Sequence, residues 1–225
     1  MLITLDLMSA FVRCRYQAYL KCTGEAGEAS GYALLQRELA SDYEQKACAK
    51  LAEPLDPSQV VSGPPSMAYA LTRHHRLILN APSVDDRRSV VFPAIERLVP
   101  NTGKPEIAPI AFSPNKKLSK DEKHTAALAG TGLSCWHALD VKYVRVIHGP
   151  EFLSTKLVLL GKSGPTHLAK ESLAALHDLE ALAANPTPPS MYLNDHCGVC
   201  EYRDRCRKDA VARDDLSLLR GLQPK

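Results

Sequence analysis

Three cysteines crowd into one short stretch near the C-terminus, as Cys197-Gly-Val-Cys200 followed five residues later by Cys206. An isolated cysteine usually packs as a small hydrophobic side chain, whereas a crowded set needs another explanation. Two thiolates separated by two residues can face one metal centre across a tight turn, and a following helical turn can bring in a third. The pattern therefore predicts a metal centre whose fourth ligand comes from elsewhere. The remaining cysteines are scattered: Cys14, Cys22, Cys48 and Cys135.

The cellular compartment decides how these cysteines are interpreted. Residues 1–8 contain Asp6 and no basic residue, so they do not resemble a secretory signal. No apolar run approaches the roughly 20 residues that a membrane-spanning helix needs. We therefore expect a cytoplasmic protein with no membrane partner. Because that compartment keeps thiols reduced, the seven cysteines do not indicate a disulfide framework.

Composition and length indicate an ordinary globular domain. The 225 residues are 45% hydrophobic and 24% charged, which excludes wholesale disorder. A net charge of +3 identifies no partner by itself. A basic cluster beside the crowded cysteines is of the kind that contacts phosphates, and we take it as the candidate nucleic-acid-binding set: Arg203, Arg205, Arg207 and Lys208.

Hydrophobic periodicity predicts an α/β fold with a mixed sheet flanked by helices. Tyr32, Leu35 and Leu39 recur at helical spacing, and Ser119 with Glu122 forms a capping box. The expected helices cover 7–23, about 32–51, 119–139 and 165 to about 184. The expected strands cover 76–79, 89–92, 107–112, 141–147 and 155–160. We expect one domain, comprising N-terminal helices (1–66), a sheet core (67–184) and a Cys-rich segment with a tail (185–225).

Two metals compete for the predicted centre. Structural zinc sites normally use two paired ligand motifs, and this chain has one, although His196 offers a nitrogen ligand. Iron–sulfur clusters favour ligation by cysteine alone. A distant fourth cysteine is then required, and Cys14 on the first predicted helix is available. Zinc and an unmetallated set of thiols remain the alternatives.

The cysteine-bearing segments resemble a known family. Residues 13–20, Arg-Cys-Arg-Tyr-Gln-Ala-Tyr-Leu, together with 196–206, His-Cys-Gly-Val-Cys-Glu-Tyr-Arg-Asp-Arg-Cys, are similar to iron–sulfur RecB-like nucleases of the PD-(D/E)XK superfamily, which include CRISPR-associated RecB-like exonucleases. Residues 93–98, 109–112 and 146–149 resemble segments of large RecB-family proteins. The tail, 213–222, resembles the point where those proteins pass into further domains. The chain is therefore either a stand-alone version or a part of something longer.

This resemblance implies a restriction-endonuclease-like core and a 4Fe–4S cluster that ties the C-terminal segment to the first helix. The implied ligands are Cys14, Cys197, Cys200 and Cys206. Cys22, two helical turns beyond Cys14, is the rival for the first ligand, and the family spacing favours Cys14. We expect Cys48 and Cys135 to be core residues.

The resemblance also marks where catalytic residues are missing. Active relatives use an Asp on one strand, and an acid with a Lys two residues later on the next, to hold Mg²⁺ and orient water. Pro93 stands at the first position here, Ala111 at the second and Ser113 at that of the Lys. None of the three can perform its counterpart's role.

A displaced active site is the alternative. Asp140-Val-Lys142 has the acid-x-Lys spacing, and Asp85, Asp86 or Glu96 would be its partner. About one or two such spacings are expected by chance, so this motif is weak. Mg²⁺ or Mn²⁺ would bind only in this case.

The expected function is that of a catalytically degenerate nuclease domain with a structural cluster. It would bind nucleic acid, DNA before RNA, or assemble with a protein partner or further domains in a DNA-processing system. The alternatives are an active metal-dependent exonuclease at the displaced site, and an interaction scaffold built around zinc.

Overall fold

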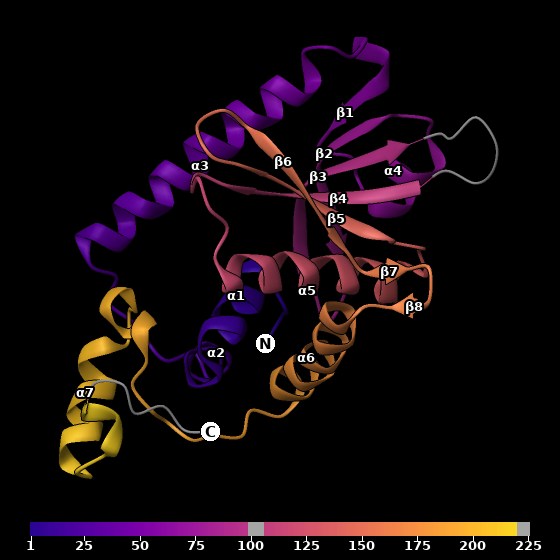
Figure 1. Cartoon of the computed structure of the whole chain (residues 1–225). Coiled ribbons are helices and arrows are strands. Elements are labelled where there is room, and N and C mark those ends of the chain that lie inside the picture. Colours follow the sequence, from indigo (N-terminus) through magenta and orange to yellow (C-terminus); the bar gives the residue numbers. More distant parts are fainter. Residues whose placement is uncertain (99–105, 220–225) are drawn as a thin grey trace.

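The computed structural model describes residues 1–98 and 106–219, and it has an α/β fold (Figure 1). Its centre is a mixed sheet of six strands in the spatial order β1-β2-β3-β4-β5-β6. The strands are β1 (Val60–Ser62), β2 (Leu77–Val84), β3 (Ser89–Leu98), β4 (Glu106–Ser113), β5 (Tyr143–His148) and β6 (Leu153–Val158). A separate small ribbon is formed by β7 (Leu160–Gly161) and β8 (Gly164–Pro165).

Strand directions follow from the connections. β2, β3 and β4 are antiparallel neighbours in sequence, whereas β5 runs parallel to β4 and β6 returns antiparallel to β5. A parallel pair needs a long crossover, which helix α5 (Lys120–His137) supplies between β4 and β5. Strand β1 adds to the edge, parallel to β2.

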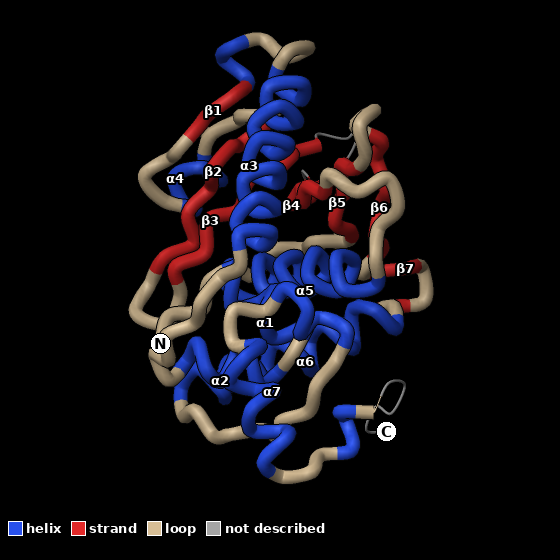
Figure 2. The backbone as a smooth tube through the Cα atoms, turned by 90° about the vertical axis from the view of Figure 1, so that its left-hand side faces the viewer, coloured by secondary structure: helices blue, strands red, loops and turns tan. Residues whose placement is uncertain are grey.

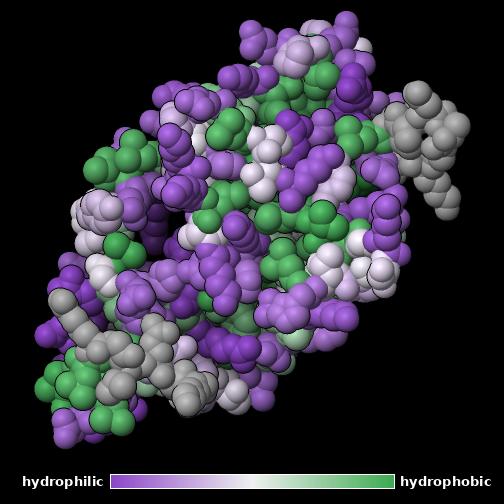
Figure 3. Space-filling view, viewed as in Figure 1, coloured by the Kyte–Doolittle hydropathy of each residue, from purple (hydrophilic) through white to green (hydrophobic). Residues whose placement is uncertain are grey.

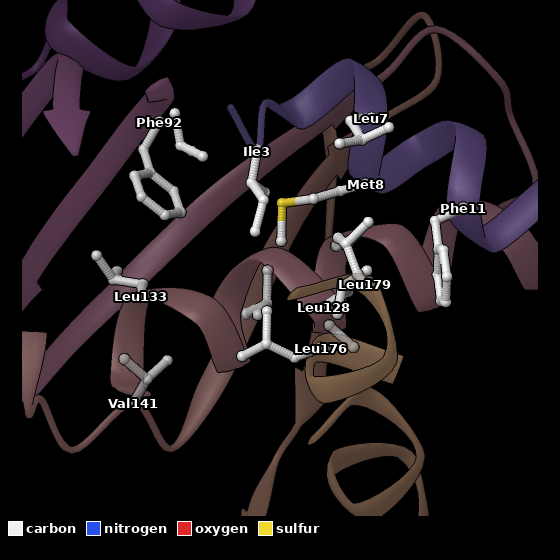
Figure 4. Close-up of a cluster of buried hydrophobic side chains, with 14 of the residues drawn as sticks. Ile3, Leu7, Met8, Phe11, Phe92, Leu128, Leu133, Val141, Leu176 and Leu179 are labelled. Atoms are coloured by element: carbon white, nitrogen blue, oxygen red, sulfur yellow. The ribbon is translucent and has the colours of Figure 1, made fainter. Parts of the chain in front are cut away.

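Three helices cover one face of the sheet and build the main core. They are α1 (Leu5–Arg13), α5 and α6 (His167–Ala184). Met8, Leu128 and Leu176 are almost completely buried where these helices meet, and Phe92 reaches them from β3 (Figure 4). Helix α5 begins at the predicted capping box, in which Ser119 and Glu122 satisfy each other's backbone N–H groups.

The opposite face carries helix α3 (Gly31–Ala52), which lies across the strands (Figure 2). Tyr43 and Ala47 pack against Ile110 and Ile147 of the sheet. Only the second half of α3 is covered in this way. Tyr32, Leu35 and Leu39 are 50–60% exposed, and hydrophobic surface is visible over this helix in Figure 3. The predicted helix is confirmed, but much of its apolar stripe is not core.

A third, small cluster of buried residues lies away from the sheet. It joins α2 (Arg15–Cys22) to α7 (Arg203–Ala212) and the segment before it. Leu20, Met191, Tyr202 and Cys206 are its main members. Short 3₁₀ turns flank this region and the first strand: η1 (Pro57–Gln59), η2 (Asp195–Val199) and η3 (Leu216–Leu218).

Several expected elements differ from those observed. The helix predicted over 7–23 is two helices, because Cys14 has extended backbone angles (φ −160°, ψ 112°). Strands β2 and β3 are longer than predicted, and the stretch between α3 and β2 contains two elements that were not predicted, β1 and the short helix α4 (Met67–Thr72). Cys135 is exposed and Cys48 only half-buried, so the expectation that both are core residues is wrong. Among the described helices, none has the length and apolar character to cross a membrane.

Candidate metal centre

Cys14 stands at the junction between α1 and α2. Its backbone N–H continues the hydrogen bonding of α1 by donating to the Ala10 carbonyl, while its Sγ accepts a hydrogen bond from the Gln17 N–H, 3.4 Å away. The thiol therefore caps the N-terminus of α2, where the helix dipole favours negative charge. The interruption of the predicted helix places this sulfur in a position to act as a ligand.

The C-terminal cysteines lie on two short elements. Cys197 is in η2, Cys200 ends that turn and Cys206 is on α7. The Asn194 N–H donates to Cys197 Sγ at 3.3 Å, and Cys206 is 8% exposed. One turn and one helix thus present three thiols to the same side.

All four implied cluster ligands line one small cavity. Cys14, Cys197, Cys200 and Cys206 surround it together with Met191 and Tyr202. Figure 2 shows α7 close to α2, as this arrangement requires. The rival Cys22 instead packs against the main core. The structure therefore brings Cys14, and not Cys22, to the C-terminal cysteines.

Burial controls the protonation of these thiols. It raises the pKa of Cys200 to about 12 and that of Cys206 to about 11, and it also raises the pKa of Cys14. Negative charge on one thiol would further disfavour ionisation of its neighbours. Without a cation the thiols at Cys200 and Cys206 are neutral at pH 7, so binding a metal here must release protons.

The two kinds of metal group predicted for this centre require different spacings of their sulfur ligands. Within residues 1–98 and 106–219, no three His, Cys, Asp or Glu side chains are placed to hold one metal ion together. A single zinc ion would require its sulfur ligands to lie about 2.3 Å from one point. A cluster of several iron and sulfide ions is wider and keeps its thiolates farther apart.

His196, the nitrogen ligand of the zinc alternative, has a partner outside the cysteine set. Its Nε2 lies 2.6 Å from Asp121 Oδ2 at the start of α5. Only Nδ1 remains for a metal, and the contact with Asp121 instead ties the Cys-rich segment to the sheet core.

Protein contacts also hold the Cys-rich segment independently of any metal. Glu201, whose side chain is 10% exposed, pairs with Lys21 of α2 at 2.6 Å and accepts a hydrogen bond from Gln17 at 2.9 Å. The Tyr202 hydroxyl donates to the Glu25 carbonyl at 3.0 Å, and the Asn194 side chain donates to the Arg13 carbonyl at 3.2 Å. A largely buried ion pair and hydrogen bonds across the junction thus position the segment that carries the cysteines.

The positions matched to catalytic residues lie on adjacent strands. Ala94 pairs with Ile110, so Pro93 and Ala111 fall one step farther along the β3–β4 pair. Ser113 is buried and donates a hydrogen bond to Glu122 at the start of α5. This region contains a proline, a methyl group and a hydroxyl that is already hydrogen-bonded.

The displaced alternative does not form a single group of carboxylates. Lys142 donates to Glu106 at 2.6 Å, Glu96 accepts from Arg145 at 2.8 Å, and Asp85 pairs with Arg88. Asp140 is exposed. Asp86, the remaining suggested partner, is also exposed.

The predicted nucleic-acid-binding residues are all exposed on α7, but they differ in their neighbours. Arg205 pairs with Glu25 at 2.8 Å, and Arg203 lies 3.5 Å from Asp204. In the part of the chain that the structure describes, Arg207 and Lys208 form no ion pair, so they are the more available cations.

Comparison of the chain with models of protein families and with curated proteins gives no match. Membership of the RecB-like family therefore stays a prediction from the sequence.

Proposed function

We propose that the four cysteines hold a 4Fe–4S cluster and that its role is structural. The observation that supports this proposal is the convergence of Cys14 with three cysteines nearly two hundred residues away around one cavity. When bound, the cluster would supply covalent crosslinks between the start of α2 and the C-terminal segment. The chain's own contribution is to place the thiols and to donate backbone N–H groups to the sulfurs of Cys14 and Cys197.

We further propose that the domain is a RecB-like nuclease fold that no longer cuts. The order α1, then β2, β3 and β4 antiparallel, then α5, then β5 parallel to β4 agrees with the restriction-endonuclease-like core that the resemblance implies. Pro93, Ala111 and Ser113 supply no carboxylate for Mg²⁺. The remaining role is to bind nucleic acid or to assemble with a partner in a DNA-processing system.

Metal analysis tests the first proposal. The anaerobically purified chain is expected to be brown and to contain iron, and Cys14→Ala is expected to lose that iron while Cys22→Ala retains it. Stoichiometric zinc with no iron would instead establish the zinc scaffold. Retention of iron by Cys14→Ala together with its loss from Cys22→Ala would assign the fourth ligand to Cys22.

Binding and cleavage assays on the cluster-loaded chain test the second. Single- and double-stranded DNA should bind more tightly at low salt and remain intact with Mg²⁺ or Mn²⁺. Arg207→Ser with Lys208→Ser should weaken binding and reduce the salt dependence, whereas Arg205→Ser, whose cation already has an acidic neighbour, should do less. Cleavage that disappears in Asp140→Ala or Lys142→Ala would establish the displaced active site.

A further inference from the structure

A second cavity lies on the face of the sheet that α3 covers. Its volume is about 490 Å³, which falls in the range of roughly 300–1,000 Å³ typical of small-molecule sites. Leu77 and Ile110 and Ile147 of the sheet line it, and Ala47 and Leu51 line it from α3. It shares no lining residue with the cysteine cavity.

One wall of this cavity is held in an unusual conformation. Phe152, in the turn between β5 and β6, has φ +56°, a region that bulky residues rarely occupy. The Tyr43 hydroxyl donates to the Gly149 carbonyl at 2.8 Å, and the Tyr43 and Phe152 rings stack with centroids 5.1 Å apart. Such a conformation persists only where its surroundings fix it, and it is typical of functional sites.

The Phe152 ring already has two partners within the protein. Tyr43 stacks on it, and the Lys50 ammonium is 4.7 Å from the ring centroid. Apart from Phe152, the apolar residues that line the cavity are aliphatic. The lining therefore favours a hydrocarbon chain over a flat aromatic ligand.

The charged residues around the cavity are mostly positive. Lys50, Arg76 and Arg145 line it with one carboxylate, Glu96. Arg145 donates to Glu96 at 2.8 Å and to Ser154 at 2.9 Å, so this guanidinium and this carboxylate are paired. Across the described residues, Lys50 and Arg76 have no ion-pair partner. The cavity therefore has two cations available to a bound anion.

We propose that this cavity binds a small aliphatic carboxylate. The hydrocarbon part would lie on Leu77, Ile110 and Ile147, and the carboxylate would face Arg76 and Lys50 at the rim. A carboxylate can accept hydrogen bonds from a guanidinium and an ammonium together. This site is separate from the cysteine cavity and does not depend on the nature of the metal.

Calorimetry with octanoate as the probe tests this proposal on the full chain. Octanoate should bind and raise the melting temperature, whereas octan-1-ol, with the same chain and no charge, should bind about tenfold more weakly. Arg76→Gln with Lys50→Gln should reduce octanoate affinity to that of the alcohol. Arg37→Gln, an exposed charge on α3 that does not line the cavity, is the matched control and should change nothing.

A second variant locates the binding. Leu51→Trp should fill the cavity and abolish binding of both probes, with circular dichroism checking that it folds. Equal affinity for octanoate and octan-1-ol, normal octanoate binding by a folded Leu51→Trp, or no binding of octanoate in excess would each overturn the proposal. Tighter binding of adenosine monophosphate than of octanoate would replace the aliphatic ligand with a nucleotide.

Discussion

The cysteine cavity and the β3–β4 region around Pro93 differ in what their residues can do. The first gathers four thiols from opposite ends of the chain, with hydrogen bonds and a largely buried ion pair beside them. The second lies in the centre of the sheet, and its side chains are a proline, an alanine and a serine that donates to Glu122. One region brings four thiols around one cavity, and the other has the residues of an ordinary core.

This difference indicates what holds the molecule together. The sheet and its helices bury an extensive core that includes none of the four cysteines. The C-terminal segment buries a much smaller cluster against α2, and polar contacts such as the Lys21–Glu201 pair add to its attachment. The proposed metal group would add crosslinks at this smaller interface.

The largest effect is expected from removing a cluster ligand. Cys206→Ala should release the metal group and detach the C-terminal segment, because metal binding and folding of such a segment are coupled. Cys135→Ala, which removes an exposed thiol, should cost no more than about 1 kcal/mol. Iron content and resistance of residues 190–219 to proteolysis measure the effect. Equal behaviour of the two variants would contradict the ligand assignment.

The next effect concerns the ion pair between Lys21 and Glu201, the residue that follows Cys200. Lys21→Met leaves the Glu201 carboxylate, 10% exposed, without its cation and should cost about 3 kcal/mol. Lys46→Met, on the exposed side of α3, is the control. If protein contacts orient the cysteines, Lys21→Met should also lower the iron content. Full iron content at reduced stability would show that the thiols do not depend on this pair.

The sequence predicted the elements of the fold better than their environment. Periodicity and the Ser119 capping box located α3, α5 and α6, because these signals are local. The break at Cys14 was not predicted, since that residue lies inside an apolar pattern that continues on both sides. Nor does periodicity say which helical face packs against another element. The exposure of Leu35 and Leu39 therefore could be recognised only from the tertiary structure. The spacing of Cys197, Cys200 and Cys206 predicted that their thiols lie close together, because a tight turn followed by one helical turn can bring residues at these separations to the same side.

A core substitution should have the reverse effect: it should lower the stability of the fold and leave the iron content of the folded molecules unchanged. A Cβ at Gly130 of α5 would clash with Val144 Cγ2 and would lie 3.2 Å from Leu159 Cδ1. Gly130→Ala should therefore force α5 away from the sheet and cost about 1–3 kcal/mol, as overpacking does. Gly31→Ala, at the start of α3 with open space around it, is the matched control. The folded fraction of Gly130→Ala should retain its full iron content, measured per folded molecule.

The smallest effect is a pH-dependent one beside Ser113. Burial by itself raises the pKa of Glu122, but hydrogen bonds from Ser113, Ser119 and Asn115 outweigh it, and the pKa is lowered. A lowered pKa contributes stability above the unfolded value of about 4.3, and that contribution is lost as the pH falls through the folded value. Glu122→Gln should therefore be less stable than the parent by about 1 kcal/mol at pH 7, because hydrogen bonds to a charged carboxylate are stronger than those to a neutral amide.

Denaturant unfolding across pH measures this last effect. The difference between the parent and Glu122→Gln should shrink as the pH drops below about 4. Asp140→Asn, an exposed carboxylate at the displaced motif, should show no such difference. If the difference persisted unchanged in acid, the carboxylate would not be the stabilising group. The charge of Glu122 would then not be what makes its hydrogen bond from Ser113 stabilising, and the contrast between the two regions would weaken.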